Sequence, residues 1–138
     1  MQVFKSGATR DSSDDKLNYV GLLSPSVLKR YAEYLHSHRK QSDGKMRASD
    51  NWKSGIPLQN YTESLVRHMM DVWLTHDGKT CTDLRDGHII SQEEALCAVI
   101  FNAMGYLHEL LKQEPKQLTE SRSEFNECLD GINLHSGL

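Results

Sequence analysis

The chain has 138 residues, which is enough for one domain with a buried core. Its 16 lysine and arginine residues are outnumbered by 19 aspartate and glutamate residues, and this mildly acidic balance gives no support for direct, non-specific nucleic-acid binding. Three cysteines without C-x-x-C spacing argue against a disulfide scaffold, and the first residues, MQVFK, lack the apolar segment of a signal peptide, so we expect a cytoplasmic protein.

Residues 1–23 are expected to form an irregular lead-in, because Gly7 and a cluster of Asp and Ser residues suit a loop. Ser24 and Pro25 then predict the start of a helix, with serine as the capping residue and proline at the first helical position. The cationic sequence HRK is expected to end this amphipathic helix. The apolar residues that recur at helical spacing are Leu28, Tyr31, Ala32 and Leu35.

Residues 41–57, QSDGKMRASDNWKSGIP, form a long connection that places one aromatic residue, Trp52, among the cations Lys45, Arg47 and Lys53. A loop of this length and composition is more often functional than idle. The alternative is that Trp52 plugs the end of the helical bundle and that the cations are only solvated.

A second helix is predicted over residues 58–75. Its apolar stripe consists of Leu58, Tyr61, Leu65, Met69, Val72 and Trp73. His68 falls at the edge of this stripe, with Asp71 beside it. Glu63 and Arg67 are four residues apart on another side and can form an ion pair.

A third helix is predicted over residues 91–112, because the sequence SQEEALCAVIFNAMGYLHELLK has one strongly polar residue, Asn102, in its apolar part. This apolar part is too long for a buried strand and too short to span a membrane. Ser91 followed by Glu94 matches a capping box, and Pro115 stops the helix. A helix that is apolar nearly all round must be surrounded by other helices, so we expect it to form the core.

The remaining segments are a polar loop at 76–90 and an amphipathic segment at about 118–132, which we expect to be peripheral. No segment shows the clean alternation of a strand. We therefore predict a single all-α domain, a small helical bundle whose core spans residues 24–113, with a peripheral segment at 114–138.

Acidic and imidazole side chains on two neighbouring helices are how helical bundles build divalent-metal sites. Glu94 and Asn102 are eight residues apart and so lie on roughly the same side of the third helix. Carboxylates with a few waters suit Mg²⁺ or Mn²⁺, which bridge the phosphates of a nucleotide, and loop cations can take the remaining phosphate charge. The candidates on the two helices are Glu63, His68, Asp71, Glu93, Glu94 and Asn102.

Each candidate also has a structural interpretation. In this interpretation, Glu94 is no more than the acid of the capping box, and Asn102 forms a hydrogen bond with the backbone of a neighbouring helix. His68 can be a satisfied histidine at the rim of the core, and Glu63 can pair with Arg67 at the surface. No glycine-rich phosphate loop follows a strand and no G-x-S-x-G motif is present, which excludes P-loop, Rossmann and serine-hydrolase sites.

Four segments of the chain carry short motifs in a fixed order: FKSGATRDSSDDKLNYVGLLSP, DNWKSGIP, RHMMDVW and EEALCAVIFNAMGYLHELL. They contain a G-x-x-R-D…K lead-in, an N-W-x-x-G-x-P loop, an R-H-x-x-x-x-W helix and a late helix that ends around an asparagine. With these motifs, which span residues 3–111, the chain resembles the small phage dATP/dGTP diphosphohydrolase domain proteins, the MazZ type of the MazG-like superfamily.

The resemblance implies a MazG-like all-α fold that uses Mg²⁺ to cut a nucleoside triphosphate to monophosphate and pyrophosphate. It also implies a homo-oligomer, a dimer or tetramer, that shapes the purine deoxynucleotide pool in the host cytoplasm during phage infection. The superfamily pattern is E-x-x-E on one helix and E-x-x-D on the next. Here Cys97 occupies the aspartate position. Many relatives carry histidines near the places of Glu94 and Ala98, and Asn102 follows their pattern.

The function that we predict is a metal-dependent purine deoxynucleoside triphosphate diphosphohydrolase with no membrane association. Its expected metal ligands are Asp71, Glu93 and Glu94, and its further catalytic candidates are Glu63, His68 and Asn102. The expected substrate-binding residues are Arg10, Lys16, Lys45, Arg47, Asn51, Trp52 and Lys53. The alternative, favoured by the missing E-x-x-D, is a non-catalytic phage accessory protein that binds a nucleotide or a host protein.

Overall fold

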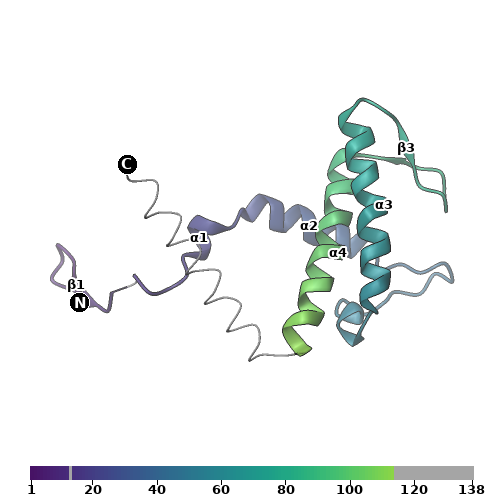
Figure 1. Cartoon of the computed structure of the whole chain (residues 1–138). Helices are drawn as coiled ribbons and strands as arrows, with labels where there is room; N and C mark the ends of the chain where they lie inside the picture. Colours follow the sequence, from purple (N-terminus) through teal and green to yellow (C-terminus); the bar gives the residue numbers. More distant parts are fainter. Residues whose placement is uncertain (13, 114–138) are drawn as a thin grey trace, which may run out of the picture.

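The computed structural model describes residues 1–12 and 14–113, and helices dominate this part of the chain (Figure 1). α3 and α4 lie side by side, and α2 packs against α4. The predicted mostly helical character is therefore confirmed. Among the described residues, no helix combines the length and the apolar character needed to cross a membrane. The elements in chain order are β1 (Gln2–Val3), β2 (Thr9–Arg10), α1 (Tyr19–Leu22), α2 (Pro25–Ser37), the 3-10 helix η1 (Asn51–Ser54), α3 (Leu58–His76), β3 (Cys81–Thr82), β4 (Ile89–Ile90) and α4 (Gln92–Gln113).

The start of α2 is the one that the sequence predicts. The Ser24 hydroxyl accepts a hydrogen bond from the backbone N–H of Val27 at 3.3 Å, and Pro25 is the first helical residue. Tyr31 is the buried residue of this helix, and its hydroxyl donates to the Met104 sulfur at 3.4 Å. This contact attaches α2 to α4.

The closest packing in the body is between α3 and α4. Tyr61 on α3 is 1% exposed, and its ring lies against Gly105 of α4 so closely that a Cβ atom at Gly105 would overlap it. The ring also meets Phe101 edge to face, with 6.0 Å between ring centroids. The small residues of α4 therefore let a large aromatic ring of α3 fill the interface. The buried residues of α4 are Ala95, Cys97, Ala98, Asn102 and Gly105.

Two expectations about packing are wrong. α4 is not surrounded by helices, because α2 and α3 cover only part of its circumference and leave Leu107 53% exposed. On α3, Met69 and Trp73 do not belong to the buried stripe, since they are 53% and 64% exposed. The face of α3 that meets α4 contains Tyr61 instead.

Short strands were not expected, because the sequence shows no alternation. The structure forms two antiparallel pairs, β1–β2 and β3–β4, in which each strand has two residues, too few for an alternating pattern to show. Cys81, expected in a polar loop, is buried in β3. The predicted segment 118–132 lies outside the described residues.

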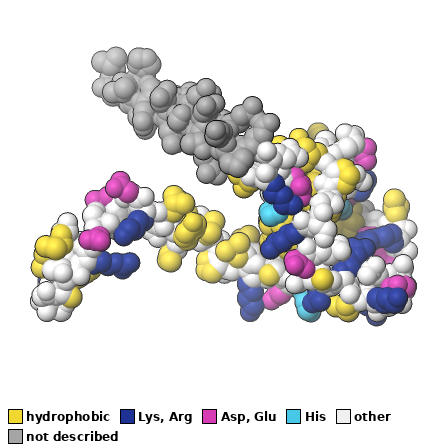
Figure 2. Space-filling model, turned by 90° about the horizontal axis from the view of Figure 1, so that it is seen from below, with side chains coloured by type: hydrophobic (Ala, Val, Ile, Leu, Met, Phe, Trp, Pro, Cys, Tyr) yellow, Lys and Arg dark blue, Asp and Glu magenta, His cyan; other side chains and the backbone are white. Residues whose placement is uncertain are grey.

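The described part of the lead-in, up to residue 23, is exposed throughout. β1 and β2 form a small hairpin whose turn includes Gly7 at φ +84°, a conformation that favours glycine. Asn18 caps α1 by accepting a hydrogen bond from the Gly21 N–H at 3.1 Å. Figure 1 shows this extension reaching away from the helical body, and Figure 2 shows hydrophobic side chains along it.

The Tyr61–Gly105 contact predicts an effect of Gly105→Ala opposite to the one that helix propensity predicts. Alanine is favoured over glycine in a helix by roughly 1 kcal/mol, so Gly105→Ala would stabilise an unconstrained helix. We expect Gly105→Ala to lower the free energy of unfolding by about 1–3 kcal/mol, because the new methyl group overlaps the Tyr61 ring. Urea denaturation followed by circular dichroism measures the change.

A second background tests the cause. When Tyr61→Leu has removed the ring, Gly105→Ala should cost less than in the unmodified chain, or should stabilise it. Equal costs in the two backgrounds would show that the Tyr61 ring is not the obstacle.

Candidate functional site

Two adjoining cavities, of about 760 Å³ and about 430 Å³, lie among the carboxyl end of α2, the turn between β3 and β4, and α4. The larger extends over the loop after α2 and onto η1, and the smaller reaches α3. We call the two cavities together the cleft. Its size suits a small organic ligand. Both cavities are lined by Tyr34, His38, Arg85, Glu94 and Phe101.

The loop after α2 gives the larger cavity a cationic wall that contains Arg39, Lys40 and Arg47. The backbone N–H of Arg47 donates to the Arg39 carbonyl at 2.8 Å, and the Arg39 Nε donates to the Arg47 carbonyl at 2.8 Å. Lys40 and Met46 pair between them as an antiparallel bridge. The cationic wall is therefore the neck of a hairpin, and it suits phosphate or carboxylate groups.

Aromatic side chains form another part of the cleft. Trp52 on η1 packs edge-on against Phe101 and His108 of α4, with ring centroids 6.4 Å and 4.7 Å apart, and it also lines the larger cavity. It thus both plugs the bundle and faces the cavity. Burial, and then the nearby Glu94 carboxylate, raises the pKa of Tyr34 to about 12, so its phenol remains a neutral hydrogen-bond donor at physiological pH.

The turn between β3 and β4 is held by Asp83 at its start. The backbone N–H of Arg85 donates to Asp83 Oδ1 at 2.8 Å, and the Arg85 guanidinium donates to both carboxylate oxygens at 3.2 and 3.1 Å. These hydrogen bonds lower the pKa of Asp83 to about 2. Gly87 completes the turn at φ +74°, and its N–H donates to the Asp83 carbonyl at 2.8 Å.

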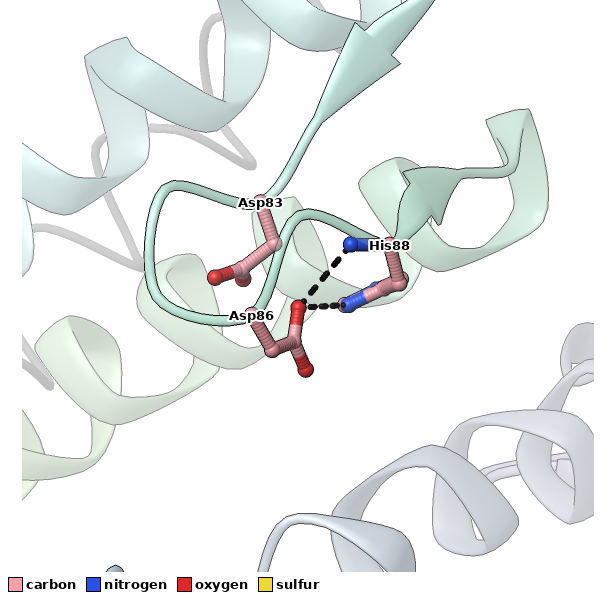
Figure 3. Close-up of side chains that lie close together, drawn as sticks. All are labelled: Asp83, Asp86 and His88. Carbon is pink, nitrogen blue, oxygen red and sulfur yellow. Dashed lines mark hydrogen bonds and ion pairs between the residues drawn. The ribbon is translucent and has the colours of Figure 1, made fainter.

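His88 joins this turn to α4. Its Nδ1 lies 2.6 Å from Asp86 Oδ1, and its Nε2 lies 2.9 and 3.0 Å from the two oxygens of Glu94 (Figure 3 draws the Asp86 contacts). The hydrogen bonds to Asp86 and then to Glu94 raise the pKa of His88, because both carboxylates favour the imidazolium form. The backbone N–H of Glu94 donates to the Ser91 hydroxyl at 3.1 Å, so this residue takes part in capping while its carboxylate binds His88.

Asp83, Asp86 and His88 each offer one ligand atom, and these three atoms lie within 4.8 Å of one another (Figure 3). Carboxylate oxygen and imidazole nitrogen together suit a divalent cation such as Mn²⁺. No other group of this kind is formed by the described acidic, histidine and cysteine side chains. We call Asp83, Asp86 and His88 the acidic turn cluster, and Glu94 of α4 binds its His88.

Six of the predicted site residues line the cleft. His68 and Asn102 face the smaller cavity, Glu94 faces both cavities, and Arg47, Asn51 and Trp52 face the larger one. The Asn102 amide Nδ2 donates to the Ala98 carbonyl of its own helix at 2.8 Å. The expected alternative of a bond to a neighbouring helix is therefore not what the structure forms.

The predicted metal ligands do not converge. Asp71 Oδ2 lies 3.4 Å from His68 Nδ1, and Glu93 Oε2 lies 3.8 Å from Arg30 Nε with its side chain 73% exposed. Neither residue lines the cleft, and no three-ligand group among the described residues includes Asp71, Glu93 or Glu94.

The other predicted site residues lie outside the cleft. Glu63 accepts a hydrogen bond from Gln59 at 3.0 Å and Arg67 donates to Ser64 at 3.0 Å, and the described part of the chain shows no Glu63–Arg67 ion pair. The Lys53 ammonium lies over the face of the Trp52 ring, 5.7 Å from the ring centroid. The remaining residues that do not line the cleft are Arg10, Lys16 and Lys45.

Sequence reasoning missed the acidic turn cluster. Its residues follow the spacing D-x-x-D-x-H in a glycine-containing turn, a pattern of potential metal ligands that could have drawn attention to residues 83–88. His38 is a further cleft residue that the sequence did not single out: its Nδ1 lies 2.8 Å from the Tyr34 carbonyl, and the residue lines both cavities.

Comparison of the chain with models of protein families, with curated proteins and with solved structures gives no match. Function is therefore inferred from the site and from the sequence resemblance alone.

The bridging position of His88 predicts its titration in metal-free protein. Its pKa should lie above the ordinary value of 6.5. The hydrogen bonds then stabilise the fold fully below the unfolded-state pKa, and their contribution is lost as the pH rises through the raised folded-state pKa. NMR titration of the His88 ring in the presence of EDTA measures this pKa.

Single neutral variants locate the cause. Asp86→Asn and Glu94→Gln should each lower the pKa of His88. Glu93→Gln is the matched control, because Glu93 is next to Glu94 in the sequence but pairs with Arg30. An unchanged pKa in both Asp86→Asn and Glu94→Gln would contradict the bridging geometry.

Proposed function

We propose that the cleft binds a purine deoxynucleoside triphosphate with a divalent metal ion and hydrolyses it to the monophosphate and pyrophosphate. The observation that carries this proposal is that a cationic wall, aromatic rings and the acidic turn cluster meet around one cleft, with Glu94 lining both of its cavities. The larger cavity has a volume in the range of small-molecule sites. The sequence resemblance, rather than the geometry of the cleft, implies that the substrate is a purine deoxynucleotide and that the product is pyrophosphate.

The cationic wall provides the binding of the triphosphate in this proposal. Arg39, Lys40 and Arg47 line the same cavity, and arginine binds phosphate oxygens through two parallel hydrogen bonds. Asn51 and Trp52 face this cavity beside the wall. Trp52 would stack on the nucleoside base, an interaction that contributes roughly 1–3 kcal/mol in nucleic-acid complexes.

The acidic turn cluster fits the metal ion better than the helix residues expected from the sequence. Asp83, Asp86 and His88 would be its ligands, with Mg²⁺ or Mn²⁺ as the ion, because their ligand atoms already lie within 4.8 Å of one another. Asp83 Oδ1 accepts two hydrogen bonds from Arg85, whereas Oδ2 accepts one and retains a second lone pair for a metal ion. A divalent ion bound there supplies polarisation of a phosphoryl oxygen and lowers the pKa of a bound water.

The chain's own side chains orient the reacting groups. Glu94 fixes the plane of the His88 ring through Nε2, and Arg85 fixes the carboxylate of Asp83. Tyr34 keeps its proton and can donate it in a hydrogen bond to a phosphate oxygen. On the α3 side of the cleft, Asp71 holds the Nδ1 edge of His68.

We further propose that the chain acts in the cytoplasm, that of the host if it is phage-encoded, and that it assembles as a homo-oligomer. The resemblance implies both. The mostly helical body agrees with a MazG-like fold, which remains part of the proposal.

A pyrophosphate-release assay tests the enzyme. We expect release from dATP and dGTP in Mg²⁺ or Mn²⁺, little release from the other six common nucleoside triphosphates, and none in EDTA. Release that continues unchanged in EDTA would contradict a metal-dependent hydrolase, and release from all eight substrates alike would contradict the purine deoxynucleotide preference.

Variants of the cleft separate binding from chemistry. Asp86→Asn and Glu94→Gln should lower kcat by about 100-fold or more, because both perturb the acidic turn cluster. Arg47→Ala should raise KM roughly tenfold with a smaller effect on kcat. Matched controls on the exposed surface of α2, Glu33→Gln and Lys29→Ala, should behave like the unmodified chain. Full turnover in both cluster variants would refute the site.

A non-catalytic nucleotide-binding protein is the second candidate, and Cys97 is the observation that favours it. This residue occupies the aspartate position of E-x-x-D, is 4% exposed, and has a pKa raised by burial, so it provides no anion there. This candidate predicts that a nucleotide raises the melting temperature equally with and without EDTA, and that no pyrophosphate is released.

A further inference from the structure

An apolar face of α4 stays exposed in the part of the chain that the structure describes. α3 meets this helix at Gly105, and α2 meets it at Met104. On the side turned away from Gly105, four leucines are between 36% and 53% exposed, and an exposed alanine lies between them. We call this set the outer face of α4, and it consists of Leu96, Ala103, Leu107, Leu110 and Leu111.

The outer face of α4 is continuous along the helix. At 3.6 residues per turn, its positions occupy an arc of about 100° on the side opposite Gly105. Between positions 95 and 111, Glu109 is the only aspartate, glutamate, lysine or arginine residue, and it falls on the Gly105 side. Leu96, Ala103 and Leu110 are seven residues apart, which is the repeat of a helix–helix seam. The face therefore suits a second helix packed along it.

The sequence that directly follows α4 contains an apolar pattern of the same period. The segment 118–132 lies outside the described residues, and its large apolar residues recur at steps of seven, four and three positions. They are Leu118, Phe125, Leu129 and Ile132. On a helical wheel, all four acidic residues of the segment lie about 110° or more from the centre of this apolar side, and Arg122 borders it. This is the pattern of an amphipathic helix with one face to bury.

The segment and the outer face of α4 also match in length and are joined by a short link. At 1.5 Å per residue, residues 118–132 as a helix and the outer face each extend over about 20 Å. α4 ends at Gln113, and Pro115 lacks the N–H group that would continue it. The link 114–117 has a length typical of connections between two antiparallel helices, which are about two to five residues long. The chain can therefore turn back along α4 directly.

We infer that residues 118–132 form a helix that folds back antiparallel on the outer face of α4. Counted from the middle of the link, Phe125 comes level with about residue 106, so its ring lies between Ala103 and Leu107. The small side chain of Ala103 leaves room for this ring. The acidic side of the segment faces solvent, and α4 is covered on three sides, by α2, α3 and this segment.

The short link favours the chain's own segment over any other occupant of this face. A segment tethered beside its docking site has an effective concentration that is roughly millimolar, so a separate molecule at lower concentration competes poorly with it. The face and the segment also have the same helical period and similar lengths. This inference does not depend on the nucleotide or the metal.

Cross-linking of the native Cys128 in the full chain tests where the segment lies. Counted in the same way, Cys128 comes level with about residue 103, so Ala103→Cys brings two thiols together. We expect a short bismaleimide to join these two thiols within one chain, as identified by mass spectrometry of the cross-linked peptides. Cys81 and Cys97 are buried and do not compete for the reagent. Met69→Cys is the matched control, because Met69 is 53% exposed on α3, and it should not cross-link to Cys128.

The other outcomes of this experiment overturn the inference. A cross-link of Cys128 to position 69 instead of position 103 would place the segment on α3. A cross-link between Cys128 of one chain and position 103 of another would make a second copy the occupant. No cross-link at position 103 in the folded protein would leave the face to a different partner.

Charge substitutions test which side of the segment is buried. Phe125→Glu should lower the melting temperature of the full chain by at least about 5 °C, because it places a charge against the outer face of α4. Leu107→Glu should have a similar effect, whereas on an uncovered face it would be nearly neutral. Ser123→Glu is the matched control, since it adds the same charge on the acidic side of the segment, and it should leave the melting temperature unchanged. Equal effects of Phe125→Glu and Ser123→Glu would overturn the inference.

Discussion

The close approach of α3 and α4 at Gly105 is the constraint on which the described body depends. The Tyr61 ring occupies the place that any side chain at Gly105 would need, so the two helices can come together only at this register. Asn102 and Glu94 precede Gly105 along α4, and this register places both of them in the lining of the smaller cavity. His68 of α3 lines the same cavity. The packing of one aromatic ring on one glycine thereby positions the α-helical side of the cleft.

The remaining side of the cleft is fixed by charge rather than by packing. Asp83, Asp86 and His88 stand on a turn with little buried surface, and it is the contact of His88 with Glu94 that ties this turn to α4. Arg85 offsets part of the negative charge by binding Asp83. The cleft therefore has an acidic part and a cationic wall, which is the distribution that a metal–phosphate ligand requires.

The sequence was sufficient for the features that depend on local chemistry. The serine–proline start of α2 and the bounds of α3 and α4 within one or two residues follow from caps and helical periodicity. It was insufficient for features that depend on how two elements pack against each other. Periodicity placed Met69 and Trp73 in the core, but α3 packs against α4 with a different face. The sequence indicated Glu94 by its place at the start of α4. Its partner, His88, lies on a turn, and the conformation of a turn cannot be predicted from hydrophobic periodicity.

The hairpin that carries the cationic wall has a consequence for how the site can change. Its closing contacts join Arg39 to Arg47 within the same short segment, and they use backbone groups and one guanidinium rather than buried side chains. Substitutions among its exposed residues therefore alter the charge and reach of the wall with little cost to the α3–α4 packing. The charge of the wall and the stability of the fold are thus separable in this chain, so that the wall can diversify in evolution while the helical body is retained.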